Sequence, residues 1–534
     1  MQVLTADAAA RLVRSGDTVL VGGVVSMVAP EAVMCALGER FAREGAPARL
    51  TIICPNRTGW KDSGAQADVP HGVEHFAQRG MVEHVITSTF SAPVSPRFMG
   101  LVMDGSIAAS VVPMGLLFRW LRECTARSPG LLTEVGIGTF FDPAVSAAVP
   151  ASAGTAVARP GGMARRLEID GRPCLLLPSR RIDVALIRGS LADPEGNISL
   201  EDEPVNGGAL QMAMAARTSG GKVIVVVRGL AECGALHPRL VQIPGIFVDA
   251  VVVDPAARQS QAEPEPAFTG RVRRHDLALP PLPLDCDKAI LRRAAMELHR
   301  GDIVNLGFGM GTRLPAVAAE EEFIGDLRFS VEHGAIGGVP ATGGAFGAHY
   351  NPSAIIDATD LFDFYHGGGL NAAILGFAEV DALGNVNVGG AYTGALRGPG
   401  GFADIAYRTR TVLICGTLTS GGLQARFPGG RIEIAQEGRH RKFRHRVGHI
   451  DLCGPAAAAR GQRVLVVTER CVFEVRPQGL TLIELAPGLE PERDIAPQLD
   501  FPLLCAPQLV TMPAALFGAA RMGLTLRERQ ETAP

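Results

Sequence analysis

The segment ARLVRSGDTVLVGG (residues 10–23) decides the fold, because its pattern returns as MELHRGDIVNLGFG at residues 296–309. Each copy predicts an amphipathic helix, a Gly-Asp turn, a β-branched strand and then glycines. A second pair follows in the same order: DVALIRGSLADPEGNIS (183–199) aligns without gaps with NAAILGFAEVDALGNVN (371–387), each a buried strand and a turn that ends in Gly-Asn. The chain is therefore expected to contain two similar halves.

In both halves, short β-branched runs alternate with alanine-rich helical stretches. The runs VIVVV (223–227) and VLVV (464–467) have the length of strands that are buried on both faces. This alternation predicts an α/β fold with two similar open α/β/α domains, Rossmann-like and largely parallel, in one chain. Because open α/β sheets bind ligands at the carboxyl ends of their strands, we expect the active site in the cleft between the two domains.

The length of 534 residues also favours more than one domain. The stretch QAEPEPAFTGRVRRHDLALPPLPLD (261–285) is rich in proline and polar residues, which is typical of a linker. We place the boundary near residue 275, with an N-terminal domain at 1–275 that includes the linker and a C-terminal domain at 276–534. The repeated markers lie farther apart in the first half, and its extra residues are expected to shape the ligand cleft.

Composition excludes several classes of function. The net charge is −3 and the longest basic run is RHRKFRHR (439–446), so no nucleic-acid partner is expected. We interpret that run as a solvated strand face, with a contact to a ligand phosphate as the alternative. No apolar run approaches the roughly 20 residues that cross a bilayer, and the N-terminus lacks a secretory signal pattern, so we expect a cytoplasmic protein without a membrane partner. The ten cysteines form no C-x-x-C pair, so neither disulfides nor a zinc site is indicated.

One segment, SVEHGAIGGVPATGGAFGAHYNPSAIID (330–357), places a single carboxylate beside small residues. Glu332 follows a predicted strand at 327–331. The glycines that come next leave main-chain N–H groups open and let a ligand approach the backbone closely. This arrangement suits a nucleophilic glutamate, whereas the alternative is a salt-bridged or helix-capping glutamate on a surface turn.

This segment closely resembles the family I coenzyme A transferases, in the acyl-CoA:acetate/3-ketoacid (propionate) CoA-transferase branch. In that branch, a glutamate within T-x-E-x-G-x-I-G-G-x-P attacks the acyl-CoA thioester, and Glu332 falls on this glutamate. The likeness continues through FDFYHGGGLNAAILGFAEVDALGNVNV (362–388) and GPGGFADI (398–405), and weaker agreement covers almost the whole chain. The resemblance implies the same two-domain arrangement.

The resemblance implies an enzyme that transfers CoA from a short-chain acyl-CoA to a carboxylic acid of the acetate, propionate or 3-oxoacid type. The reaction would be a ping-pong cycle through a glutamyl-CoA thioester. Coenzyme A would be a substrate, and neither a cofactor nor a metal is expected. The alternatives are an acyl-CoA hydrolase on the same framework and a non-catalytic protein that binds acyl-CoA or a sugar phosphate. The family also implies a homo-oligomer, a dimer or a tetramer.

Two glycine loops are expected to support the chemistry. In related enzymes, a G-x-G loop and a G-x-G-G-F loop supply main-chain donors, and here these are residues 307–309 and 398–402. We assign the N–H groups of Phe308 and Gly400 to the oxyanion hole that stabilises the tetrahedral intermediates. Four glycines are expected to bind CoA: Gly307, Gly309, Gly334 and Gly401. The alternative for the glycines at 307–311 is a dinucleotide-binding loop, but they lack the spacing G-x-G-x-x-G that such a loop needs. The alternative for GPGGF (398–402) is a simple tight turn.

Other features have two interpretations. HGVEH (71–75) fits an H-x-x-E-H zinc pattern, but no third ligand is evident and we expect His75 to pack near the cleft. Three departures from the family are expected to change the acyl pocket: Asn371 in place of an aspartate, GGAYTG at 389–394, and PNRTGWKDSGAQADVP at 55–70. Three side chains are candidates for lining that pocket: Tyr365, Phe346 and Met114.

Overall fold

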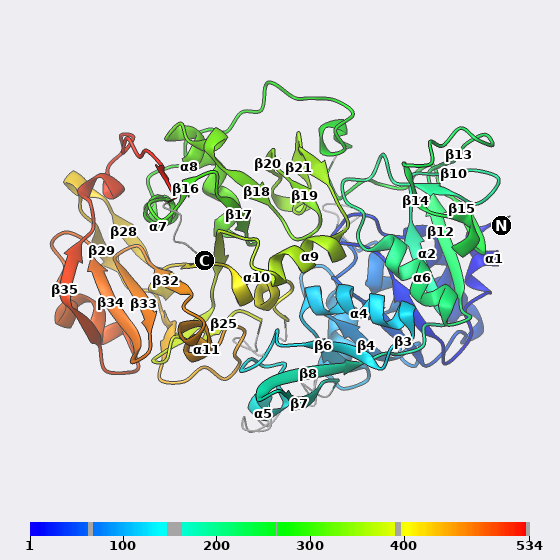
Figure 1. The fold of residues 1–534 in the computed structure, drawn as a ribbon, viewed down its shortest axis with the longest axis horizontal. Helices are drawn as coiled ribbons and strands as arrows, with labels where there is room; N and C mark the ends of the chain where they lie inside the picture. Colours follow the sequence, from blue (N-terminus) through cyan, green and yellow to red (C-terminus); the bar gives the residue numbers. More distant parts are fainter. Residues whose placement is uncertain (62–67, 147–162, 263, 390–396, 530–534) are drawn as a thin grey trace.

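The computed structural model describes residues 1–61, 68–146, 163–262, 264–389 and 397–529. Its two halves lie side by side along the long axis, and each is built on one large sheet (Figure 1).

The N-terminal half contains an eight-stranded sheet in the order β1-β15-β12-β9-β2-β3-β4-β5, and every neighbouring pair is parallel. Its strands are β1 (Gln2–Leu4), β2 (Thr18–Val21), β3 (Leu50–Cys54), β4 (Val82–Thr87), β5 (Ala108–Val111), β9 (Val184–Arg188), β12 (Lys222–Val227) and β15 (Ala250–Val253). The apolar residues of β12 are fully buried, as expected for a parallel sheet covered by helices on both faces.

The C-terminal half contains a ten-stranded sheet in the order β22-β19-β18-β17-β23-β26-β32-β33-β34-β35. Its strands are β17 (Ile303–Leu306), β18 (Arg328–Ser330), β19 (Ala335–Ile336), β22 (Ala354–Ile355), β23 (Ala372–Gly376), β26 (Thr411–Cys415), β32 (Arg463–Val467), β33 (Cys471–Arg476), β34 (Gly479–Leu485) and β35 (Leu504–Thr511). The central strands β18 to β32 are parallel, and antiparallel pairs join them to β19 and β33. The order β18-β17-β23-β26-β32 matches β3-β2-β9-β12-β15, which confirms the two similar α/β domains.

The helices that precede the repeated strands end earlier than predicted. They are α1 (Ala6–Ala10), capped by the Thr5 hydroxyl, and α7 (Cys286–Ala295), capped by the Asp285 carboxylate. The residues after each helix form a turn, in which Gly16 and Gly301 adopt φ angles of 85° and 79°. The repeated segments therefore contain the turn and the strand but only the last residue of the first helix.

The remaining helices and short strands cover these sheets or extend them. The helices are α2 (Glu31–Glu44), α3 (Pro96–Met103), α4 (Met114–Ala126), α5 (Pro143–Ser146), α6 (Ala209–Thr218), α8 (Leu314–Glu320), α9 (Ala358–His366), α10 (Phe402–Arg408) and α11 (Gly454–Ala459). The short strands are β6 (Gly130–Thr133), β7 (Arg165–Ile169), β8 (Arg172–Pro178), β10 (Leu191–Ala192), β11 (Ile198–Ser199), β13 (Gly229–Leu230), β14 (Val241–Ile243), β16 (His299–Arg300), β20 (Val339–Pro340), β21 (His349–Tyr350), β24 (Glu379–Asp381), β25 (Val386–Asn387), β27 (Thr419–Ser420), β28 (Gln424–Arg426), β29 (Glu433–Gln436), β30 (His440–Arg441), β31 (Phe443–Arg444) and β36 (Arg527–Glu528).

The two halves pack together through α4, which contacts α9 and α10 at the centre of the molecule (Figure 1). The main-chain N–H of Gly115 on α4 donates to the buried carboxylate of Asp404 on α10 at 2.9 Å. Arg122 on α4 forms ion pairs with Asp360 and Asp363 on α9. One buried core includes residues from both halves, and the boundary near residue 275 stays a prediction.

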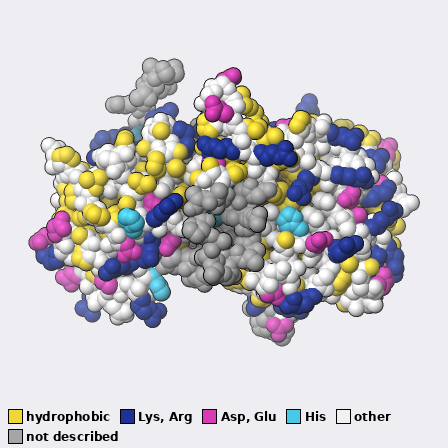
Figure 2. Space-filling view, turned by 90° about the horizontal axis from the view of Figure 1, so that it is seen from below, with side chains coloured by type: hydrophobic (Ala, Val, Ile, Leu, Met, Phe, Trp, Pro, Cys, Tyr) yellow, Lys and Arg dark blue, Asp and Glu magenta, His cyan; other side chains and the backbone are white. Residues whose placement is uncertain are grey.

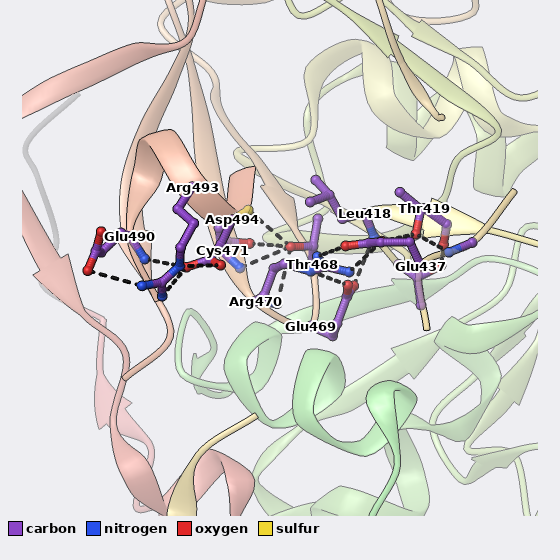
Figure 3. Close-up of polar contacts among 12 residues, drawn as sticks. Leu418, Thr419, Glu437, Thr468, Glu469, Arg470, Cys471, Glu490, Arg493 and Asp494 are labelled. Atoms are coloured by element: carbon purple, nitrogen blue, oxygen red, sulfur yellow. Dashed lines mark hydrogen bonds and ion pairs between the residues drawn. The ribbon is translucent and has the colours of Figure 1, made fainter. Parts of the chain in front are cut away.

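A buried polar network fixes the turn between β32 and β33 (Figure 3). Arg470 donates to Glu469 at 2.8 Å and to Glu437 at 2.6 Å. The other oxygen of Glu469 accepts the N–H of Leu418 at 2.8 Å, so this network joins the loops that follow β26 and β32. These contacts satisfy the buried charges and hold two neighbouring loops at the carboxyl edge of the sheet.

The surface shows mixed charge on the face in Figure 2, where basic and acidic side chains lie among each other. The basic run at 439–446 forms β30 and β31, and most of it is exposed as predicted. Lys442 and Phe443 are exceptions, since both are buried and the Lys442 ammonium lies 3.5 Å from the centre of the Phe377 ring. No helix in the described parts of the chain is long and apolar enough to cross a membrane.

Candidate active site

A cleft of about 540 Å³ lies between the two halves, at the carboxyl ends of their parallel strands. It contains residues that follow β2, β3 and β4 on one side and β17, β18 and β23 on the other. Its polar lining includes Asn56, Arg57, Thr89, Ser91, Glu332, His333 and Arg397. The extra residues of the first half contribute Met114 and the loop at 89–93, so they shape the cleft as expected.

Glu332 lies in this cleft immediately after β18 and is only 6% exposed. The side-chain amide of Asn305 donates to its Oε2 at 3.3 Å. Burial raises the pKa of Glu332 and the nearby Asp404 raises it further, while the Asn305 hydrogen bond partly opposes this shift. Gly401 packs against the side chain, because a Cβ added there would lie 3.3 Å from Glu332 Cγ. The carboxylate is therefore crowded, poorly hydrated and open to the cleft.

A hydrogen-bonded chain lies behind this carboxylate. Asn305 also approaches the Tyr365 hydroxyl at 3.5 Å, and this hydroxyl lies 2.6 Å from Ser330 Oγ. Tyr365 is fully buried and does not line the cleft, and burial raises its pKa. Of the three candidates for the acyl pocket, Phe346 and Met114 line the cleft, whereas Tyr365 supports Asn305 from behind.

His333 was not identified from the sequence, although it follows Glu332 directly. Its Nε2 lies 3.0 Å from the side-chain nitrogen of Asn56, so this contact joins the two halves. Burial lowers the pKa of His333 to about 3, with further contributions from Arg57 and His349, and the imidazole is neutral at physiological pH. Its Nε2 is 3.9 Å from Glu332 Oε1, so a neutral ring borders the nucleophile candidate.

The two proposed oxyanion donors differ in their surroundings. The N–H of Phe308 has no hydrogen-bond partner within the described residues, and its side chain is 67% exposed at the cleft. The N–H of Gly400 instead donates to the carbonyl of Ser88 at 3.1 Å. Gly400 would have to exchange this bond to donate to an oxyanion. Both assignments stay predictions.

The four glycines that were expected to bind CoA divide into two pairs. Gly307 and Gly401 line the cleft, but Gly309 and Gly334 do not. Gly309 lies in an open turn, where an added Cβ would meet nothing within 4 Å. Gly334 has a φ of 122°, and a Cβ there would lie 2.2 Å from the Ile356 carbonyl oxygen. The need for glycine at 334 therefore comes from crowding by the neighbouring backbone.

The remaining sequence features lie outside the cleft or outside the described residues. His71 and His75 both contact one oxygen of Glu31, at 3.2 and 2.7 Å. Burial would raise the pKa of Glu31, but these hydrogen bonds lower it to about 2. Asn371 lies at the amino end of β23, where its side chain accepts the N–H of Ile303 at 2.8 Å. Most of GGAYTG and part of the segment at 55–70 are outside the described residues.

The positions of these side chains bear on two expectations, the absence of a metal site and the effect of Asn371 on the acyl pocket. No group of three or more His, Cys, Asp or Glu side chains among the described residues could hold a metal ion. Asn371 does not line the cleft, because the length of β23 separates the two. Its amide instead satisfies a backbone donor at the start of β17.

Comparison with known proteins identifies the family. A family model for coenzyme A transferase matches residues 3–254. The chain is 36% identical over 541 residues to the acetate CoA-transferase YdiF of Escherichia coli O157:H7, covering 98% of this chain and 97% of that protein. It is also 36% identical over 537 residues to the caffeate CoA-transferase of Acetobacterium woodii, covering 98% of each.

A solved structure extends the likeness to three dimensions. The crystal structure of the YdiF apoenzyme from the same strain superposes with a TM-score of 0.89 at 35% identity, covering 99% of this chain and 98% of that one. A second structure of that protein, a thioester complex with CoA, gives a TM-score of 0.88. Sequence and fold agree over the full length, and the chain belongs to the coenzyme A transferase family.

Proposed function

We propose that this protein transfers coenzyme A from a short-chain acyl-CoA to a carboxylic acid, with Glu332 as the nucleophile. The observation that carries this proposal is the position of Glu332. It is the one acidic side chain among the described residues that line the cleft, and it is buried at the carboxyl edge of a parallel sheet. The existence of a YdiF thioester complex with CoA supports a covalent route in a close relative.

The proposed cycle keeps the energy of the thioester bond. The Glu332 carboxylate attacks the thioester carbonyl, and the tetrahedral intermediate collapses to a mixed anhydride as the CoA thiolate leaves. The thiolate then attacks the glutamyl carbonyl, which gives a glutamyl-CoA thioester and releases the first acid as its carboxylate. A second carboxylate attacks this thioester, and the same steps in reverse release its CoA ester. Coenzyme A is thus a substrate, and the proposed cycle uses no metal or other cofactor.

The surroundings of Glu332 suit its two proposed roles, as the attacking carboxylate and as the carrier of CoA in the thioester. A raised pKa gives a more basic and more nucleophilic carboxylate, and the burial of Glu332 limits competing attack by water. The Phe308 N–H has no partner among the described residues and can stabilise the oxyanion, and we propose that Gly400 joins it when substrate binding displaces the Ser88 carbonyl. His333 is neutral, so it does not hold Glu332 in an ion pair.

Intact-protein mass spectrometry tests the covalent step. We expect a CoA-sized adduct after mixing the protein with acetyl-CoA, propionyl-CoA or acetoacetyl-CoA without an acceptor acid, and borohydride reduction should localise it to Glu332. Glu332→Gln should give no adduct and no transfer while still binding CoA. Transfer by this variant near the wild-type rate would exclude Glu332 as the nucleophile. Rapid release of free CoA without an acceptor would instead favour the hydrolase.

We also propose that the protein acts as a cytoplasmic homo-oligomer. Three large apolar side chains on β13, before β14 and in the turn at Gly245–Phe247 are well exposed: Leu230 (55%), Leu240 (53%) and Ile246 (74%). Such exposure on a folded surface suits contact with another subunit. Light scattering during size-exclusion chromatography should give a mass above that of the 56.1 kDa chain, and a monomer at micromolar concentration would contradict this.

A further inference from the structure

The cleft contains a cation that has no partner among the residues that the structure describes. Arg57 follows β3 and lines the cleft together with Glu332 and His333. Within the described residues, its guanidinium forms no hydrogen bond and no ion pair, and burial lowers its pKa. Glu332 does not satisfy it, since the polar contacts of that carboxylate are to Asn305 and His333. A poorly hydrated cation without an anion is unfavourable, so a bound anion would stabilise this site.

The position of Arg57 favours an anion close to the reacting carbon. Its charge contributes to lowering the pKa of His333, the residue next to Glu332. The other arginine in the lining, Arg397, is exposed to solvent and can meet a hydrated phosphate there. The planar guanidinium of arginine offers two parallel N–H donors, which match the two oxygens of a carboxylate.

A small apolar cavity adjoins the same arginine. Four residues line both this cavity and the cleft: Arg57, Thr89, Phe90 and Ser91. Its far wall is formed by Val73, Val85, Phe98 and Met99. The cavity volume is about 20 Å³, and a single water needs roughly 10–15 Å³ by the same kind of measure. This space admits the end of a short hydrocarbon chain and excludes a long one.

We propose that Arg57 forms the binding subsite for the free carboxylic acid, which enters or leaves as a carboxylate during transfer. The carboxylate is held by the guanidinium, and its short apolar chain is directed into the small cavity. This inference rests on the proposed function, because it assigns the site of the second substrate of that reaction. Arg57 acts as a binding and positioning residue and forms no covalent bond.

A single-turnover experiment separates this role from the binding of acyl-CoA. The glutamyl-CoA form is prepared with propionyl-CoA, freed of small molecules, and mixed with increasing propionate while the adduct is followed by mass spectrometry. In Arg57→Gln, we expect the propionate concentration for half-maximal decay to rise about ten- to a hundredfold, as for the loss of a charge-assisted hydrogen bond. The limiting rate and the acyl-CoA concentration needed to form the adduct should change much less. The propionate concentration for half-maximal decay in Arg57→Lys should lie between those of the wild type and Arg57→Gln.

Two controls make the result decisive. Arg165→Gln removes the same charge from the exposed strand β7, outside the cleft lining, and should leave the propionate dependence unchanged. Arg57→Gln should melt no lower than the wild type, because the guanidinium has no stabilising contact to lose among the described residues. A lower melting temperature would indicate a structural arginine and overturn the proposal.

The outcomes distinguish this inference from the proposed function. An unchanged propionate dependence, or a rise only in the acyl-CoA requirement, would overturn the carboxylate subsite and assign Arg57 to CoA. If the wild type forms no adduct, the covalent function fails, and the subsite is then tested by propionate-induced thermal stabilisation. Stabilisation of the wild type but not of Arg57→Gln supports the subsite, whereas equal stabilisation of both overturns it.

Discussion

At the scale of single residues, burial gives Glu332 its chemical character. A solvated glutamate is a weak nucleophile, but the walls of the cleft remove water and raise the pKa of this carboxyl. Asn305 supplies one hydrogen bond to it, and Tyr365 and Ser330 hold the position of that amide. The same burial that favours reactivity makes the ionised side chain costly for the folded protein.

The stability of Glu332→Gln should therefore depend on pH. The pKa of Glu332 in the folded protein lies above its ordinary value of 4.5. The contribution of this carboxyl to stability is therefore fully present below pH 4.5, and it is lost as the pH rises through the pKa of the folded state. Glutamine has no proton to lose. We expect the variant and the wild type to melt at similar temperatures near pH 4, with the variant increasingly more stable towards pH 8.

Thermal denaturation across this pH range measures the difference in melting temperature. Glu168→Gln on the exposed strand β7 is the matched control, and its difference from the wild type should stay nearly constant. A difference for Glu332→Gln that shrinks as the pH rises would show that the folded protein does not penalise the ionised carboxylate.

At the scale of elements, α4 determines how the two halves meet. Its first turn has a glycine at position 115, and this allows α9 and α10 to approach closely. A Cβ added there would lie 2.4 Å from the Phe362 ring and 2.7 Å from the Asp404 carboxylate. Asp404 belongs to the same short helix that begins beside Gly401, so the contact is linked to the wall of the cleft.

Gly115→Ala should destabilise the protein and lower its activity. Replacing glycine by alanine within a helix is normally worth up to about 1 kcal/mol of stability, but overpacking a buried contact costs about 1–3 kcal/mol, so the clash should dominate. Gly100→Ala in α3 is the control, because an added Cβ meets nothing within 4 Å there. Melting temperature and adduct formation would be measured together, and a Gly115→Ala protein as stable and active as Gly100→Ala would contradict the packing argument.

At the scale of the whole molecule, two sheets that share the order of five parallel strands face a common cleft. The family model ends at residue 254, next to the last strand of the N-terminal sheet at Val253. The contacts between the halves are buried and polar at several points, including Gly115 with Asp404 and Asn56 with His333. Each half thus has its own sheet but depends on the other to complete the site.

A chain divided at residue 275 should therefore reassemble. We expect fragments 1–275 and 276–534, produced together, to elute as one complex and to form the CoA adduct, because one buried core includes residues of both halves. Each fragment alone should aggregate or bind a hydrophobic dye, since its interface is exposed. Two fragments that stay soluble and separate would show that the boundary or the role of the interface is wrong.

The sequence by itself determined the elements that depend on local pattern. Buried β-branched runs, Gly-Asp turns and their repetition predicted two largely parallel sheets, and the glycine-flanked Glu332 predicted the candidate nucleophile. These features depend on neighbours along the chain, so their signals lie within short segments. The C-terminal ends of α1 and α7 were less well predicted, because the apolar periodicity of a helix continues into the turns that follow Ala10 and Ala295.

Only the tertiary structure decided which side chains meet in the cleft. Asn56 and Arg57 come from the first half, Glu332 and His333 come from the second, and no motif links the two pairs. The structure also separated Gly334 and Asn371, which serve backbone packing, from Gly307 and Gly401, which line the site. The physical reason is burial: the environment of a charge or an N–H group depends on the residues that fold over it, and these lie far away in the sequence.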